Sequence, residues 1–169
     1  MPPSNEIPAR ADHTAPDLKH LFSELIRLET ELWDAVAGRL RADYGLPLQQ
    51  FEFMQVIART PNCRVQDIAA EISITVGGTS KIVDRVEAAG YCVRSANPSD
   101  RRSSILKLTP EGERLLAAAT VTFEQELRAR LGSGVPDRTL AQFTNTLTRL
   151  RASVRSVDAA EKDRLILPA

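Results

Sequence analysis

One stretch of the chain, residues 64–112, constrains the fold more than any other. From 65 to 72, apolar residues recur at helical spacing, and a break at 73–75 separates them from a second helical pattern at 76–89. Gly90 suits the end of that second helix, because glycine readily takes the left-handed backbone conformation found there. Two amphipathic helices joined by a tight turn predict a helix-turn-helix.

Two short strand patterns follow this motif, at 91–95 and 103–108. The tip between them, residues 96–102, contains a proline and two adjacent arginines. Helix, turn, helix and a basic-tipped hairpin together predict a winged helix-turn-helix. The fold class we predict is mainly α with a small β-hairpin wing, flanked by N- and C-terminal dimerisation helices.

The flanking segments read as long helices with apolar seams. Asp17 can cap a first helix that ends near Gly45, and Thr109-Pro110 is a typical helix start. Another helix begins near Pro136, and its apolar residues recur at spacings of three and four, typical of a helix that packs along another helix. The predicted organisation is a disordered tail at 1–16, a dimerisation helix at 17–45, a DNA-binding domain at 46–112, dimerisation helices at 113–157 and a C-terminal tail at 158–169.

Several pieces of this text, in their order and spacing, resemble the MarR (multiple antibiotic resistance regulator) family of bacterial transcription factors. They are IAAEI, VDRVEAAGY, Arg94 and DRRSSILKLTPEG. Asp100 and Arg102 fall on the Asp-x-Arg at the family's wing tip, and 108–112 on its Leu-Thr-Pro-x-Gly. The resemblance extends over roughly residues 17–157. It implies a homodimeric regulator that binds double-stranded DNA.

The second helix of the motif is the expected reader of bases. A helix in the major groove reaches base edges with side chains near its N-terminus. We therefore predict DNA contacts along this helix, and the candidates are Thr75, Gly78, Thr79, Ser80, Lys81 and Arg85. The Gly77-Gly78 pair either lets backbone N–H groups approach a phosphate or relieves crowding. For Asp84 we expect an ion pair with Arg85.

The hairpin is the second expected DNA reader. The chain has no net charge, but residues 64–108 carry seven basic and five acidic side chains, so positive charge gathers here. Arginines entering a narrow minor groove meet its negative potential. The candidates are Arg94, Asp100, Arg101 and Arg102. The alternative is a pair of solvated surface arginines at the tip.

Composition excludes several other classes of protein. No apolar run approaches the roughly 20 residues of a membrane span, so we expect a cytoplasmic protein without a membrane partner. His13 and His20 are too few for a zinc site, and Cys63 and Cys92 do not form Cys-x-x-Cys. We predict no metal, no cofactor and no enzymatic activity. Redox sensing through Cys63, placed in an exposed loop, stays open as an alternative, whereas Cys92 reads as a packed strand residue.

A small-molecule effector is the last expectation. A wedge between dimerisation helices and DNA-binding lobe would offer aromatic faces and cationic donors, which suits an aromatic or anionic effector. Its lining residues would be His20, Arg27, Trp33, Phe51, Met54 and Arg114. For Trp33 the alternative is plain packing. The function predicted is thus an operator-binding repressor released by an effector, and the alternative is a winged-helix protein-interaction module without base-specific DNA binding.

Overall fold

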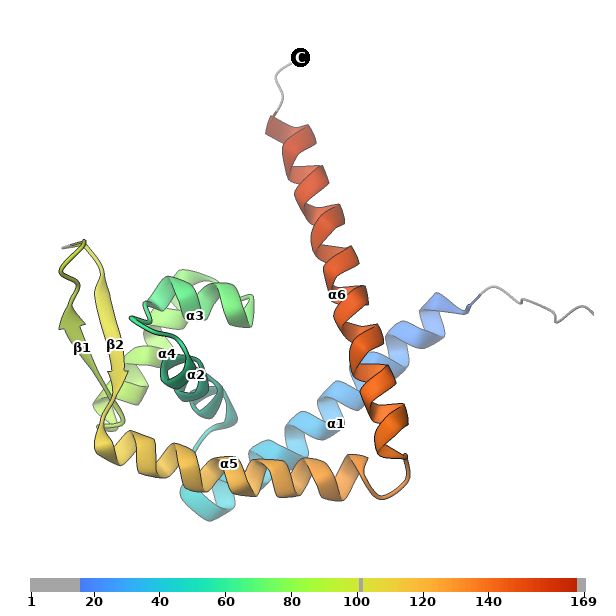
Figure 1. Cartoon of the computed structure of the whole chain (residues 1–169), viewed down its shortest axis with the longest axis horizontal. Helices are drawn as coiled ribbons and strands as arrows, with labels where there is room; N and C mark the ends of the chain where they lie inside the picture. Colours follow the sequence, from blue (N-terminus) through green and yellow to red (C-terminus); the bar gives the residue numbers. More distant parts are fainter. Residues whose placement is uncertain (1–15, 101, 167–169) are drawn as a thin grey trace, which may run out of the picture.

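The computed structural model describes residues 16–100 and 102–166, with side chains described as far as 157. The tail predicted at 1–16, apart from Pro16, and the candidate Arg101 therefore lie outside the described residues. The element order is α1 (Leu18–Tyr44), α2 (Leu48–Arg59), α3 (Val65–Ile72), α4 (Val76–Ala88), β1 (Cys92–Ala96), β2 (Ser104–Leu108), α5 (Pro110–Leu131) and α6 (Asp137–Ile166). The predicted fold, mainly α with a small β-hairpin wing and flanking helices, is confirmed (Figure 1).

Local sequence signals account for both ends of α1. The Asp17 carboxylate accepts a hydrogen bond from the His20 backbone N–H (3.0 Å) and so caps the first turn. Gly45 ends the helix with φ at 64°, and its N–H donates to the Arg41 carbonyl. Only glycine takes this backbone conformation without steric cost, which explains the stop after Tyr44.

The helix-turn-helix core is formed where α2, α3 and α4 bury their apolar faces. Phe51, Met54, Ile68 and Val83 are almost fully buried there. Thr75 caps α4, because its hydroxyl accepts from the Gly78 N–H at 3.2 Å. The predicted bounds of α3 are confirmed, and α4 ends one residue earlier than predicted.

The wing is a two-stranded antiparallel hairpin that is tied to the helical core. Cys92 pairs with Leu108 at its base and Ala96 with Ser104 near its tip. The Leu106 N–H also donates to the Cys63 carbonyl in the α2–α3 connection (2.7 Å). This bond fixes β2 to the helix-turn-helix and sets the direction in which the tip projects.

The start of α5 is joined to the end of α4 through Thr109. Its hydroxyl accepts from the Gly112 N–H (3.0 Å) and donates to the Gly90 carbonyl (2.7 Å). Gly112 is buried at this contact, and a Cβ placed on it would lie 2.0 Å from the Tyr91 carbonyl oxygen. Glycine is therefore required sterically at residue 112.

The long helices form the other end of the molecule. α1 and α5 pack together, and the Tyr44 hydroxyl lies 2.9 Å from the Thr122 hydroxyl. α6 projects away from the body of the chain (Figure 1). It remains helical to Ile166, so 158–166 are not the tail that the sequence had suggested.

Candidate nucleic-acid interface

The exposed face of α4 carries two basic residues. Lys81 and Arg85 are both exposed, and their spacing of four places them on one side of the helix. Thr75 is exposed at the N-cap, and Ser80 is half-buried beside this face. The structure therefore brings together Thr75, Lys81 and Arg85 as predicted, with Ser80 at the margin.

Thr79 does not belong to this face, and the prediction that it is exposed is wrong. The residue is 0% exposed, and its hydroxyl donates to the Thr75 carbonyl (2.9 Å). The signal was available in the sequence, because Thr79 precedes Ile82, Val83 and Val86 by three, four and seven positions. That spacing puts it on the apolar stripe facing the core.

Gly78 has a role inside the N-cap. Its N–H is engaged by Thr75, and a Cβ on residue 78 would lie 3.2 Å from the Thr75 hydroxyl oxygen. This distance is tight for a side-chain contact. Of the two explanations for the glycine pair, relief of crowding therefore describes Gly78, whereas a Cβ on Gly77 meets nothing within 4 Å.

Arg94 is a clamp between wing and α4, so its prediction as a free DNA contact is wrong. Its guanidinium donates to the Asp84 carboxylate (2.6 Å) and pairs with Glu87, and its backbone N–H also donates to Glu87 (3.1 Å). The side chain is 25% exposed. Asp84 pairs with Arg94 and not with Arg85, because the antiparallel hairpin brings β1 against the last turns of α4.

The contacts of Arg94 with Asp84 and Glu87 keep its guanidinium charged. Partial burial alone would lower the pKa of the Arg94 guanidinium. The hydrogen bond to Asp84 and the charge of Glu87 outweigh burial, so the pKa is raised. Arg94 thus stays charged and balances carboxylates that would otherwise lie unpaired beside the basic face of α4.

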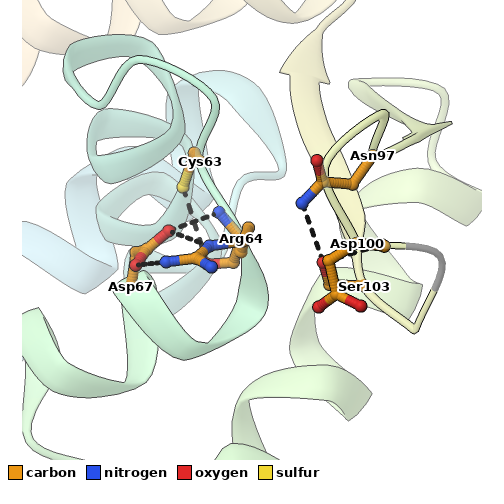
Figure 2. Close-up of polar contacts among 6 residues, drawn as sticks. All are labelled: Cys63, Arg64, Asp67, Asn97, Asp100 and Ser103. Carbon is orange, nitrogen blue, oxygen red and sulfur yellow. Dashed lines mark hydrogen bonds and ion pairs between the residues drawn. The ribbon is translucent and has the colours of Figure 1, made fainter.

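The wing tip is ordered by its own polar side chains (Figure 2). Asp100 accepts a hydrogen bond from the Arg102 backbone N–H (3.0 Å), so its carboxylate is engaged within the loop. The Asn97 amide donates to the Ser103 hydroxyl (2.9 Å) and accepts from the Ser99 N–H (3.0 Å). These bonds leave the Arg102 side chain exposed. Its contact with DNA stays a prediction.

Sequence reasoning missed a polar groove between the start of α3 and the wing. Arg64 and Asp67 line one side, and Asn97 and Ser99 line the other. The Arg64 guanidinium pairs with both carboxylate oxygens of Asp67, at 3.1 and 3.2 Å (Figure 2). Hydrogen bonds from Arg64 lower the pKa of Asp67. The sequence signal is the acidic residue three positions after Arg64, because the Asp67 carboxylate accepts from the Arg64 N–H (2.9 Å) as in a capping box.

Both cysteines are packed inside the domain. Cys63 and Cys92 are 0% and 1% exposed, and burial raises the pKa of each thiol to about 11. The expectation that Cys63 is exposed in its loop is wrong, because its side chain packs into the hydrophobic core. A thiolate is scarcely populated near neutral pH, so neither residue suits redox sensing. The expected packing of Cys92 is confirmed.

The six residues predicted to line an effector site do not converge. Trp33 lines a cavity formed by α1, α2, α5 and α6. Phe51 and Met54 are instead 0% exposed core residues, and the Phe51 ring packs 5.0 Å from that of Phe123. The other three are exposed outside the cavity lining: His20 on α1, Arg27 paired with Glu24, and Arg114 paired with Glu111.

Two general features complete the description of residues 16–100 and 102–166. Within them, no group of three or more His, Cys, Asp or Glu side chains is arranged to hold a metal ion. None of the helices in this part of the chain combines the length and apolar character needed to cross a bilayer.

Comparison with known proteins shows which families and structures this chain is similar to. The sequence model of the MarR family matches residues 46–104, from the start of α2 into the wing. The HTH-type transcriptional regulator FarR of Neisseria gonorrhoeae is 36% identical over 67 residues, which is 40% of this chain and 46% of that protein. The matched segment spans about half the length of the first curated relatives.

Solved structures extend the likeness to the long helices. Sco3205, a MarR family regulator of Streptomyces coelicolor solved with DNA, has a TM-score of 0.74 at 22% identity, over 80% of this chain and 86% of that one. The transcriptional repressor CouR, solved on a 23-mer DNA duplex, has a TM-score of 0.73 at 25% identity, over 83% and 99%. CouR of Rhodococcus jostii has also been solved with p-coumaroyl-CoA. Residues 46–104, which hold the helix-turn-helix and most of the wing, thus match the MarR family model, and most of the chain shares its fold with solved MarR family regulators.

Proposed function

We propose that this protein is a cytoplasmic transcriptional regulator that binds duplex DNA as a homodimer and represses from a pseudopalindromic operator. The observation that carries the proposal is the exposed Lys81–Arg85 face of α4 beside a wing whose tip presents Arg102. α4 enters the major groove, and Arg102 enters the adjacent minor groove. The DNA complexes of Sco3205 and CouR support the same use of this fold.

The Arg64–Asp67 pair adds a third contact to this proposal. It lies at the start of α3, across a polar groove from the wing. A guanidinium held by a carboxylate is fixed in direction, which suits a phosphate of the DNA backbone. In this role Arg64 positions the protein on the duplex without reading its sequence.

The dimer is proposed from apolar side chains that the single chain leaves exposed. On α1 these include Leu18, Phe22 and Ile26, and on α6 Val154 and Val157. Pairing such faces about a two-fold axis buries them and sets two α4 helices about one DNA turn, ~34 Å, apart.

Charges placed in the proposed seam test the dimer directly. Leu147→Asp with Leu150→Asp should give monomers in sedimentation velocity and abolish operator binding. Thr146→Asp with Thr148→Asp, also on α6, is the matched control for added charge. A stable dimer in the leucine variant would disprove the assignment.

Selection of DNA from a random duplex pool tests the proposal as a whole. We expect enrichment of a pseudopalindrome, and an affinity that falls steeply as salt concentration rises. If the selection shows no enrichment and the protein shows no salt-dependent binding to duplex DNA, the proposal is overturned in favour of the protein-interaction module. Effector control is part of the proposal and is supported by the CouR complex with p-coumaroyl-CoA. Release of the selected DNA by a small molecule is its readout.

A further inference from the structure

A cavity of about 490 Å³ lies where α1, α2, α5 and α6 meet. Its walls are largely aliphatic and aromatic, with Leu32, Trp33, Phe123 and Phe143 among them. A cavity of this size and character suits a small organic ligand.

The charges in the lining are all of one sign. Glu29 enters from α1 and Glu52 from α2, while no Lys, Arg or His is among the described residues that line the cavity. Glu29 precedes Trp33 by four positions, so carboxylate and indole share one face of α1. The cavity thus combines apolar walls, an aromatic ring and two negative charges.

Glu52 is held in an unfavourable place for an ionised group. It is half-buried, and burial raises the pKa of its carboxyl group. Among the ion pairs and side-chain hydrogen bonds of the described residues, none involves Glu52. A carboxylate beside apolar walls without a partner is costly, and a positive charge placed near it recovers that cost.

We propose that this cavity binds a lipophilic monocation, such as an aromatic quaternary ammonium or phosphonium ion. The positive charge lies near Glu52 and Glu29, and the rings pack against Trp33 and the neighbouring apolar side chains. A cation over the indole face adds a cation–π attraction. The ligand class differs from the aromatic anion that the sequence suggested, because the arginines and histidine expected in the lining lie elsewhere.

An anion is disfavoured here by the same charges. Two carboxylates repel it, and no basic side chain in the described lining compensates. The other candidate occupant is a helix of a second copy, because Phe143 and Leu147 connect the cavity to the exposed face of α6. The exposed face of α6 that a second copy would present is apolar at Leu150 and Val154, and such side chains would desolvate Glu52 without pairing it, so charge complementarity favours the cation.

The sharpest test uses two ions of the same shape and opposite charge. Tetraphenylphosphonium and tetraphenylborate are titrated by calorimetry into the full chain without DNA. We expect the phosphonium to bind at least about tenfold more tightly than the borate. Equal affinities, tighter binding of the borate, or no binding of either ion would overturn the proposal.

Variants of the two glutamates test which carboxylate distinguishes the phosphonium from the borate. Glu52→Gln and Glu29→Gln should each weaken phosphonium binding several-fold and narrow the difference from the borate. Glu24→Gln, on α1 outside the cavity, is the matched control and should leave both unchanged. Unchanged phosphonium affinity in both cavity variants would overturn the assignment. If Glu52→Gln fails to fold, Glu29→Gln and the wild-type ion comparison still decide.

Sedimentation of the same samples identifies a second copy as the occupant. If the dimer is tighter in Glu52→Gln than in the wild type and the phosphonium does not bind, the cavity is occupied by a partner helix and not by a cation. The regulatory consequence rests on the proposed function and is measured separately, as phosphonium-dependent release of the selected operator. If the phosphonium binds but does not release the operator, the cation site stands and only its regulatory role is rejected. If the protein does not bind DNA at all, the proposed function fails, but the calorimetric result for the cation site still holds.

Discussion

Arg94 on β1 donates a hydrogen bond of 2.6 Å to Asp84 on α4, and this contact links the two parts of the molecule proposed to reach DNA. The same guanidinium pairs with Glu87, one turn further along α4. A charged side chain thereby holds β1 against α4, in addition to the backbone bond that fixes β2 to the helix-turn-helix. In the proposed DNA complex, this link sets how far the wing lies from α4.

Replacing Arg94 should separate positioning from phosphate contact. Arg94→Met frees two carboxylates near the DNA-facing surface and loosens the wing, so operator affinity should fall and stability should drop by about 1–3 kcal/mol. Because the Arg94 guanidinium is engaged by Asp84 and Glu87 and is not proposed to contact a phosphate, the slope of affinity against salt should stay unchanged. Arg102→Ala should instead lower that slope by about 1.

Anisotropy titrations over a range of salt concentrations measure both effects. Arg39→Met, which breaks an exposed pair with Asp43 on α1, serves as a control and should change neither affinity nor slope. A reduced slope in Arg94→Met would show that Arg94 reaches the DNA backbone directly.

Thr79 and Lys81 should behave differently although they are two residues apart. Thr79→Val keeps the buried shape and loses one internal hydrogen bond, so stability should change by about 1 kcal/mol and base preference should not change. Lys81→Ala should relax preference at particular operator positions by about 1–3 kcal/mol. Affinity measured on a panel of single-base operator variants decides, and altered base preference in Thr79→Val would place that residue at the DNA.

Gly112 should be among the least replaceable residues of the chain. The Cβ of Gly112→Ala would overlap the Tyr91 carbonyl, so α5 must shift away from the end of α4. We expect a loss of more than about 2 kcal/mol in chemical denaturation. Gly38→Ala, where a Cβ meets nothing within 4 Å, should instead stabilise α1 by up to about 1 kcal/mol. Equal stability of Gly112→Ala and wild type would contradict the packing described for Tyr91.

The buried cysteines should make the fold sensitive to alkali. Burial raises the thiol pKa from 9.0 to about 11 for both Cys63 and Cys92. A pKa raised in the folded state means that their contribution is complete below pH 9 and is lost as pH rises towards 11. Unfolding free energy should therefore fall in that window. Cys63→Ala with Cys92→Ala should remove part of the decline, and an identical pH profile in the double variant would refute this origin.

Helix ends and the hairpin could be predicted from the sequence because local chemistry determines them. Asp17, Gly45 and Thr109 act through hydrogen bonds and backbone angles within a few residues. The role of Arg94 could not be predicted, since it depends on β1 lying against α4, a contact between distant parts of the fold. From the sequence alone, a basic residue that contacts DNA cannot be distinguished from one that pairs with a carboxylate elsewhere in the fold.

The candidate effector site failed for a related reason. Helical periodicity shows which residues share a face, but it does not show how deep that face lies. Phe51 and Met54 do face inward as expected, yet they are in the core below the cavity. Glu52 was overlooked because an acidic residue between two phenylalanines reads as solvent-facing, whereas in the fold it is half-buried and lines the cavity with residues of α1, α5 and α6.

The double hydrogen bond of Thr109 has a mechanical consequence. Because one hydroxyl bonds to both the end of α4 and the start of α5, the two helices are tied directly to each other although the hairpin separates them in the sequence. α5 has 22 residues and is about 33 Å long. A rotation of only about 5° at its far end carries Thr109 through about 3 Å, close to the rise of one base pair. In the proposed DNA complex, α5 therefore acts as a lever that converts small angular changes near α6 into a change of register on DNA.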